Sequence, residues 1–405
     1  MLDARTVQRE SQSQPAVRWL SVVGARPQFV KLAPLCRAIE GHNASGGRPR
    51  IEHAVVHTGQ HYDRAMTDVF FAELGIPEPD FNLGAGSGGP GEQLGRMLKR
   101  LEPVLKRERP EWVIVYGDTN STLAGAVIAA RLTLPVAHVE AGCRSYNAAM
   151  PEEQNRVIAD ALSRLLLAAS QSAVQNLARE GIGTAHDRMG RKVVCVGDVM
   201  KDALEHNVAV AEGRAGTTLA RLGVSASRYY LLTLHRAENT ASAEGIANVL
   251  ASLAGLDLPV VFPLHPRTRA ALRAGRGVPR IANLIVTPPI GYLDMLAVEK
   301  HCRAVLTDSG GVQKEAFYLR VPCVTLREET EWPETVALGG NRLAGTDARR
   351  IAEAVRAARP APARCASPFG DGHASERIVK ELLSTPAITV PPGGLSARAA
   401  SAAAK

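Results

Sequence analysis

The sequence predicts an α/β protein in which two doubly wound parallel sheets face each other across a cleft. Short apolar runs rich in β-branched residues alternate with helical patterns along almost all of the 405 residues. These runs form two groups of six, and residues 204–227 between the groups contain no apolar strand. Continuous apolar strands separated by helices indicate parallel sheets that are covered on both faces. Such sheets bind ligands beyond the carboxyl ends of their strands.

The strands of the first group are expected at residues 17–23, 51–56, 112–116, 136–139, 164–168 and 193–196. Those of the second group are expected at residues 229–234, 260–264, 284–287, 304–307, 323–326 and 342–344. We therefore predict an N-terminal domain over 17–203, a C-terminal domain over 204–371, and a helix at 375–385 that packs back on the first domain. The tails, 1–15 and 387–405, are polar or rich in Pro, Gly, Ser and Ala, and we expect them to be disordered.

The composition supports buried cores and a phosphate-bearing partner. Hydrophobic residues make up 45% of the chain and charged residues 22%, which argues against global disorder. The aromatic content of 4% argues against a protein that stacks single-stranded bases. The net charge of +8 suits a phosphate-bearing substrate. Because this charge is spread along the chain without a block of five like charges, we expect no nucleic-acid partner.

The predicted compartment is the cytoplasm, with no membrane partner. The start of the chain is polar and lacks the apolar core of a secretory signal. No apolar run approaches the roughly 18 residues of a membrane span. The six cysteines are scattered and form no C-x-x-C pair, which indicates free thiols rather than a disulfide frame or a zinc site.

The first strand ends in a turn that carries two cations, Arg26 and Lys31. Gly24 permits a tight turn, and Pro27 suits the first position of a helix. Because the N–H groups of a helix N-terminus favour an anion, two cations beside it would strengthen a phosphate site. The alternative is an ordinary turn with two solvated cations, and this motif alone leaves both open.

Three carboxylates converge on one edge of the first sheet. Asp118 and Glu140 each follow a strand, and Glu152 lies in the helix that Pro151 opens. Each has an ordinary explanation, because Asp118 can cap a helix and Glu152 can pair with Arg156 at a spacing of i, i+4. Three carboxylates near one edge nevertheless favour proton chemistry.

In the second half, His235 and His265 close two successive strands, and each has an arginine nearby. One histidine at a strand end is more often structural than catalytic. Two of them, each beside an arginine, enrich this edge in groups that suit phosphate.

Residues 308–316 read Asp-Ser-Gly-Gly-Val-Gln-Lys-Glu-Ala and predict a nucleotide-diphosphate site. Ser309 is a natural helix cap, Gly310 and Gly311 let a ligand approach the backbone, and the following helix presents its positive end. Glu315 would accept hydrogen bonds from a ribose diol. The alternative is an ordinary capped helix with a solvated glutamate.

No metal or redox cofactor is expected. The chain contains no H-E-x-x-H, D-x-D or cysteine–histidine cluster, and no G-x-S-x-G nucleophile elbow. Gly84, Gly86 and Gly89 match the spacing of a dinucleotide fingerprint, but no strand directly precedes them. A glycine-rich loop beside a site is the better interpretation.

Seven motifs occur in order between residues 17 and 345: G-A-R-P-Q-F-V-K, H-T-G-Q-H-Y-D, Y-G-D-T-N-S-T, H-V-E-A-G, P-E-E-x-N-R, L-H-R-A-E-N and D-S-G-G-V-Q-K-E-A. Together they resemble the non-hydrolysing UDP-N-acetylglucosamine 2-epimerase family, over most of the chain. This resemblance implies two Rossmann-like domains of the GT-B type, with the substrate in the cleft between them. It also implies a homodimer that binds a UDP-sugar.

The resemblance implies inversion at carbon 2 of a UDP-linked 2-acetamido sugar, for cell-surface polysaccharide precursors. Simple deprotonation of carbon 2 is too costly, because no carbonyl group is adjacent. Anti elimination of UDP gives a 2-acetamidoglucal instead, and re-addition with protonation from the other face inverts the centre. This chemistry needs carboxylates near carbon 2 and cations on the pyrophosphate, but neither NAD nor a metal.

The motifs assign roles to individual residues of this chain. The catalytic candidates are Asp118, Glu140, Glu152 and His235, and the three carboxylates would transfer protons, with the face on which each acts left open. The cations and the imidazole that would hold or neutralise the leaving group are Arg26, Lys31, Arg156 and His235. The diphosphate and ribose of UDP would be bound by Ser309, Gly310, Gly311 and Glu315.

Three motifs depart from the typical family. The chain reads T-E-W-P-E at 330–334 where T-E-R-P-E is typical, Q-H-Y-D at 60–63 for Q-H-R-E-M, and H-P-R-T at 265–268 for H-L-N-P. The last two lie where bacterial members bind a second UDP-N-acetylglucosamine as activator, so we do not expect that regulation here. Together they resemble the branch that acts on UDP-2,3-diacetamido-2,3-dideoxyglucuronate, whose anionic sugar needs a further cation, such as Arg267 or Arg327. That branch ranks just behind the UDP-N-acetylglucosamine reaction.

Two other classes of function use the same features. A GT-B glycosyltransferase would need the C-terminal UDP site but not three carboxylates at the edge of the first sheet. A non-catalytic sugar-nucleotide sensor would bind its ligand without exchanging the proton on carbon 2.

Overall fold

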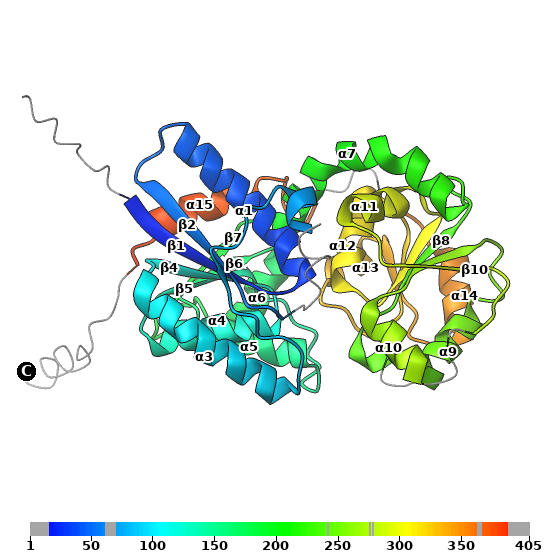
Figure 1. Cartoon of the computed structure of the whole chain (residues 1–405), viewed down its shortest axis with the longest axis horizontal. Helices are drawn as coiled ribbons and strands as arrows, with labels where there is room; N and C mark the ends of the chain where they lie inside the picture. Colours follow the sequence, from blue (N-terminus) through cyan, green and yellow to red (C-terminus); the bar gives the residue numbers. More distant parts are fainter. Residues whose placement is uncertain are drawn as a thin grey trace, which may run out of the picture.

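The computed structural model describes residues 16–60, 70–240, 243–274, 277, 279–362 and 367–387. The tails predicted to be disordered lie outside these residues, except for Ala387, and so do the positions 61–63 of the second departing motif. Two α/β lobes lie side by side (Figure 1). Every strand pairing in both sheets is parallel, which confirms the predicted fold class.

The first lobe contains a seven-stranded sheet in the order β3-β2-β1-β4-β5-β6-β7. Its strands are β1 (Ala16–Val23), β2 (Arg50–His57), β3 (Phe81–Asn82), β4 (Trp112–Tyr116), β5 (Val136–Ala141), β6 (Leu165–Ala168) and β7 (Lys192–Cys195). The helices between them are α1 (Arg26–Ala44), α3 (Pro90–Glu108), α4 (Asn120–Arg131), α5 (Pro151–Leu162) and α6 (Gln171–Arg179). Helices cover both faces, so the central strands β4 and β5 are buried along their whole length.

The second lobe contains a six-stranded sheet in the order β10-β9-β8-β11-β12-β13. Its strands are β8 (Tyr230–Thr233), β9 (Val260–Pro263), β10 (Leu284–Thr287), β11 (Ala304–Thr307), β12 (Cys323–Thr325) and β13 (Asn341–Leu343). Its helices are α8 (Ala237–Thr240), α9 (Ala243–Ser252), α10 (Pro266–Ala274), α11 (Tyr292–His301), α12 (Gly310–Leu319), α13 (Pro333–Ala337) and α14 (Ala348–Ala357). All twelve predicted strands are present within two residues at each end. The additional strand, β3, has only two residues and no apolar run that could predict it.

The connection between the lobes is the long helix α7 (Val199–Leu222). Asp198 caps its first turn, and Gly223 ends it in the left-handed conformation with φ of 68°. Apolar residues of α7 belong to one buried cluster with α1 of the first lobe and α11 of the second. The predicted boundary at residues 203/204 falls inside this helix, and the exact division of the chain stays a prediction.

The last helix, α15 (Ala374–Ser384), returns to the first lobe, as Figure 1 shows. Its residue Ile378 is buried in the same apolar cluster as Trp19 and Trp112. The indole N–H of Trp112 donates to the carbonyl oxygen of Leu382 at 3.2 Å. The first lobe is therefore built from both ends of the described chain. Within that part of the chain, no helix combines the length and apolar character needed to cross a membrane.

Candidate active site

The two lobes meet where side chains beyond the carboxyl ends of their strands come into contact. Glu140 lies at the centre of this junction, near the end of β5. The register of β5 shifts between Val139 and Ala141, and Glu140 adopts φ of 73°, in the left-handed region. That conformation costs a non-glycine residue on the order of 1–2 kcal/mol and persists where the surroundings fix it. The shifted backbone therefore leaves Glu140 out of the pairing between β5 and β6.

The carboxylate of Glu140 is held by one lysine from each lobe. Nζ of Lys31 on α1 lies 2.5 Å from Oε1, and Nζ of Lys314 on α12 lies 2.8 Å from Oε2. Burial raises the pKa of Glu140, but the two ammonium groups outweigh it and the net pKa is lowered. Glu140 is thus a buried but ionised carboxylate. Because Lys31 is itself buried, the alternative of a solvated cation does not apply to it.

Asp118 follows β4 in a turn that Gly117 makes possible with φ of 61°. The ring of His138 fixes this turn from behind, because its Nε2 donates to the carbonyl oxygen of Gly117 at 2.7 Å. Burial raises the pKa of Asp118, but Arg156, Lys31 and the second lobe's Arg236 lower it further than burial raises it. Its side chain keeps 27% exposure, so a ligand can reach the ionised carboxylate.

Glu152, in the first turn of α5, makes an ion pair across the junction. Its Oε1 lies 3.1 Å from a guanidinium nitrogen of Arg236, which follows β8. Arg156 does not pair with Glu152, although the spacing i, i+4 would allow it. Its side chain is 2% exposed, so the ordinary surface pair considered from the sequence is not formed.

Arg156 instead binds three carboxylates. It contacts Asp118, then Glu153 at 2.9 Å, and Glu331 of the second lobe at 3.5 Å. Glu331 also accepts hydrogen bonds from Arg327, the shortest at 2.9 Å. Burial raises the pKa of Glu331, yet the surrounding arginines lower it to about 2. The sequence assigned Arg156 to the leaving group; in the structure its guanidinium is paired with Asp118 and Glu153 of the first lobe and with Glu331 of the second.

On the second lobe, Asp308 organises the end of β8. Its carboxyl oxygens accept hydrogen bonds from the backbone N–H groups of His235 and Arg236, at 3.0 and 2.9 Å. The ring of His235 is 32% exposed and lies 5.3 Å from that of His265, centroid to centroid. The two histidines predicted at the ends of successive strands are therefore neighbours.

The segment 309–311 starts α12 as predicted. Ser309 is the N-cap, and its hydroxyl accepts a hydrogen bond from the N–H of Val312 at 3.5 Å. A Cβ on Gly310 would lie 3.2 Å from the indole nitrogen of Trp332, and one on Gly311 would lie 3.4 Å from Met200. These glycines keep the start of α12 close to its neighbours, with its N–H groups at the junction of the lobes.

Glu315, one turn into α12, is 6% exposed and not the solvated glutamate of the alternative. Burial raises its pKa to about 7, although the charges of Lys314 and Arg26 oppose the shift. Arg26 comes from the first lobe, where its guanidinium lies 4.3 Å from the ring centroid of Phe70. Burial lowers the pKa of Arg26 to about 10, against the attraction of Glu315 and Glu73. The structure therefore brings Arg26 and Glu315 into electrostatic contact.

Sequence analysis assigned no role to Asp198, Lys314 and Glu331, and it considered Arg236 only as the arginine beside His235 that suits phosphate. Lys314 lies in the motif at 308–316, and Arg236 follows a histidine that we selected, but neither position carries a local sign of burial. Arg327, considered as a cation for an anionic sugar, is 7% exposed and paired with Glu331. The side chain of Arg267, the other cation considered, lies outside the part described.

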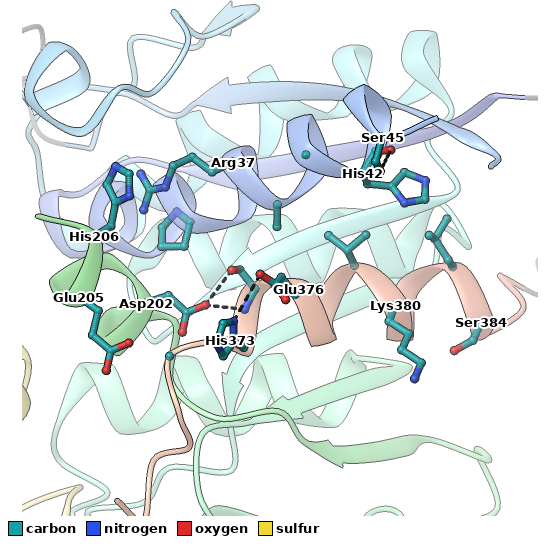
Figure 2. Close-up of a pocket in the computed structure, with 17 residues that line it drawn as sticks. Arg37, His42, Ser45, Asp202, Glu205, His206, His373, Glu376, Lys380 and Ser384 are labelled. Carbon is teal, nitrogen blue, oxygen red and sulfur yellow. Dashed lines mark hydrogen bonds and ion pairs between the residues drawn. The ribbon is translucent and has the colours of Figure 1, made fainter. Parts of the chain in front are cut away.

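A hollow of about 890 Å³ lies away from this junction, between α1, the start of α7 and α15 (Figure 2). None of the predicted site residues lines it. Asp202 fills the N-terminal end of α15, where it accepts hydrogen bonds from the N–H groups of Ala374 and Ser375. This hollow therefore offers no free helix terminus to an anion. Among the described residues, no cluster of three or more His, Cys, Asp or Glu side chains has the arrangement of a metal site.

Comparison with known proteins identifies relatives over nearly the whole chain. The family model for UDP-N-acetylglucosamine 2-epimerase matches residues 43–383. A UDP-N-acetylglucosamine 2-epimerase homolog from Methanococcus maripaludis is 44% identical over 366 residues, covering 90% of this chain and 98% of the relative. The UDP-2,3-diacetamido-2,3-dideoxy-D-glucuronate 2-epimerase of Pseudomonas aeruginosa is 42% identical, with coverage of 90% and 98%.

Solved structures agree with this relationship. The crystal structure of the Methanocaldococcus jannaschii UDP-GlcNAc 2-epimerase, in complex with UDP-GlcNAc and UDP, has a TM-score of 0.82 and 40% identity. It covers 91% of this chain and 99% of its own. A UDP-glucosyltransferase from Polygonum tinctorium, at 13% identity and a TM-score of 0.56, covers 92% of this chain and 99% of its own, and shows the shared fold alone.

Proposed function

Because the chain belongs to the UDP-N-acetylglucosamine 2-epimerase family, we propose that it interconverts UDP-N-acetylglucosamine and UDP-N-acetylmannosamine. The enzyme is an isomerase of UDP-sugars, as its relatives at 41–44% identity are by name. One observation carries the proposal. Ionised carboxylates of the first lobe lie next to the cations and the N-terminus of α12 in the second lobe. One hexose ring at this junction would be in reach of both sets.

The proposed reaction has two steps. A carboxylate removes the proton from carbon 2, the electron pair forms the double bond between carbons 1 and 2, and the bond from carbon 1 to the phosphate oxygen breaks. In the return step a phosphate oxygen of UDP adds to carbon 1, and a carboxyl group protonates carbon 2 from the opposite face. The lowered pKa values of Asp118 and Glu140 mean that both groups are ionised, which is the form that accepts a proton, and their position at the junction supports them as bases. Glu152 is the third acid/base candidate, and the face on which each acts stays open.

We propose that UDP lies on the second lobe. Ser309, Gly310 and Gly311 would present the N–H groups of α12 to the diphosphate, and Glu315 would accept hydrogen bonds from the ribose. Arg26 and His235 would neutralise the leaving phosphate, with Arg236 added from the structure. Lys31 and Arg156, assigned to the leaving group from the sequence, are bound to carboxylates here. We therefore propose that they orient Glu140 and Asp118.

A specific observation bears on the second candidate, UDP-2,3-diacetamido-2,3-dideoxyglucuronate. The Pseudomonas aeruginosa relative named for that sugar is 42% identical. An anionic sugar needs a free cation, and Arg327 is occupied by Glu331. Of the two arginines considered for an anionic sugar, Arg267 is then the one that this substrate would need, and both UDP-sugars are tested in parallel. We also propose, from the family resemblance, a cytoplasmic homodimer; light scattering on the purified protein tests the dimer.

The deciding experiment is incubation of the pure protein with each UDP-sugar alone in heavy water, followed by NMR. Product with the manno configuration and deuterium at carbon 2 is expected. No change without an acceptor would favour a glycosyltransferase, and free UDP with N-acetylmannosamine would indicate a hydrolysing enzyme. Binding without exchange at carbon 2 would indicate a sensor.

A further inference from the structure

Lys314 is the most enclosed cation at the junction of the lobes. Its side chain is 1% exposed, and its Nζ lies 2.8 Å from Oε2 of Glu140 and 2.7 Å from Oδ2 of Asp198. The same nitrogen lies 3.9 Å from the ring centroid of Trp332. An isolated buried ammonium group would lose its proton, but two carboxylates and an aromatic face stabilise the charge. Lys314 is therefore a buried ammonium ion whose contacts belong to different segments.

Its contact with Glu140 complements that of Lys31. Lys31 comes from α1 of the first lobe and binds Oε1, whereas Lys314 comes from α12 of the second lobe and binds Oε2. With one oxygen anchored from each lobe, the carboxylate plane of Glu140 cannot turn freely. A carboxylate accepts about four hydrogen bonds, so both oxygens keep lone pairs for a substrate proton.

Asp198 and Trp332 hold Lys314 in this position. Asp198 caps α7 and also accepts a hydrogen bond from the hydroxyl of Tyr318. Trp332 stands where the typical family motif T-E-R-P-E has an arginine. Its indole face lies against the ammonium group of Lys314 and attracts it. Lys314 and Trp332 thus form a compatible pair.

We propose that Lys314 is a positioning residue for epimerisation, which reaches from the second lobe to fix the carboxylate of Glu140 in the first. This inference rests on the proposed function, because it concerns the same reaction. In consequence, the proton-transfer site is complete only when the lobes are together. Lys314 itself touches the carboxylate and not the reacting carbon.

The test replaces Lys314 by methionine, which keeps the length and removes the charge, by glutamine, which keeps a donor, and by arginine, which keeps the charge. Lys300→Met, on the outside of α11 in the same lobe, is the matched control. For each folded variant, kcat is measured against pH, together with the Kd of UDP and the rate of deuterium incorporation at carbon 2.

Lys314→Met and Lys314→Gln are expected to lower kcat by about 100-fold, the scale of a misplaced catalytic group, with the Kd of UDP within about threefold. The acid limb of the profile should move to higher pH, because Glu140 loses one of the cations that hold its pKa down. The charged groups facing Glu140 are then Lys31, Asp118 and Asp198, with Cys143 and Tyr318 beside them. Lys314→Arg should recover at least tenfold over methionine, and Lys300→Met should match the wild type.

Wild-type protein that shows no exchange at carbon 2 would overturn the proposed function. Wild-type exchange together with a folded Lys314→Met or Lys314→Gln variant of unchanged kcat and unchanged acid limb would overturn this inference alone. The inference would also fail if Lys314→Arg had no higher kcat than Lys314→Met and the acid limb of the pH profile stayed at its wild-type position. Lys314 would then contribute only to packing. If methionine prevents folding, the glutamine variant decides.

Discussion

Buried carboxyl groups of the two lobes differ in the direction of their pKa shifts, apart from Glu331 of the second lobe, whose pKa the surrounding arginines lower to about 2. In the first lobe, neighbouring cations lower the pKa of Asp118 and Glu140 against the effect of burial. In the second lobe, burial raises the pKa of Glu315 to about 7, and it also raises the pKa of Asp308 and Glu299. Burial favours the neutral acid in every case, so the difference comes from the placement of lysine and arginine. In the proposed reaction, the ionised carboxylates of the first lobe would transfer protons and the second lobe would hold the ligand.

The largest effect is expected from neutralising the proton-transfer groups. Asp118→Asn or Glu140→Gln should lower kcat on the order of 10³-fold, because an amide cannot act as a base. The Kd of UDP should stay within about threefold, because UDP is proposed to lie on the other lobe. Steady-state kinetics and calorimetry measure the two quantities. Near wild-type turnover in both variants would remove the distinction between the lobes.

The next effect concerns the cation that binds three carboxylates of the junction. Arg156→Leu should lower the free energy of unfolding by about 3 kcal/mol, because it leaves buried carboxylates without their partner. Urea denaturation measures this change. Arg350→Leu, which removes an exposed pair with Glu328, is the control and should leave the midpoint unchanged. Equal midpoints for both variants would mean that Arg156 does not stabilise the ionised cluster.

A moderate effect is expected in the pH dependence of ligand binding. The pKa of Glu315 is raised from its ordinary 4.5 to about 7, and a ribose diol donates best to the ionised form. The affinity for UDP-N-acetylglucosamine should therefore fall by up to about tenfold for each pH unit below 7 and level off above it. Calorimetry with Asp118→Asn protein avoids turnover. Glu315→Gln in that background should bind more weakly, without this dependence; an identical slope would exclude Glu315 from the ribose site.

The smallest effect is expected at Glu299, which is fully buried. Neither of its carboxyl oxygens has a hydrogen-bond partner among the described residues. Glu299→Leu should raise the free energy of unfolding by about 1 kcal/mol at pH 8. The gain should shrink at pH 5. The raised pKa of Glu299 in the folded protein lowers the free energy of unfolding only at pH values where the same carboxyl group is ionised in the unfolded chain. Thermal unfolding at both pH values checks this, with the exposed Glu376→Gln as control. Destabilisation at both pH values would show that the carboxyl group has a partner.

The fold could be predicted because its signals are local. The twelve predicted strands are short, mainly apolar runs, unlike the two-residue β3, and residues soon after such runs, including Asp118 and Ser309, lie at the strand ends as expected. The contacts among site residues could not be predicted. Lys314 reads as one more charge in a helix, and only tertiary packing buries it against Glu140 and Asp198. The register shift that turns Glu140 out of β5 also has no sequence signal, since glycine would be the usual residue at φ of 73°.

The return of α15 to the first lobe affects how the protein is made. A ribosome delivers residues in order, at about 5–20 per second, and most domains fold once their own segment has emerged. Here Ile378 and Leu382 of α15 cover part of the apolar core of the first lobe. That surface stays uncovered until nearly the whole chain is synthesised. We therefore expect the second lobe to mature while the first still exposes apolar surface around Trp112, and a nascent chain halted before residue 374 to be a preferred client of chaperones.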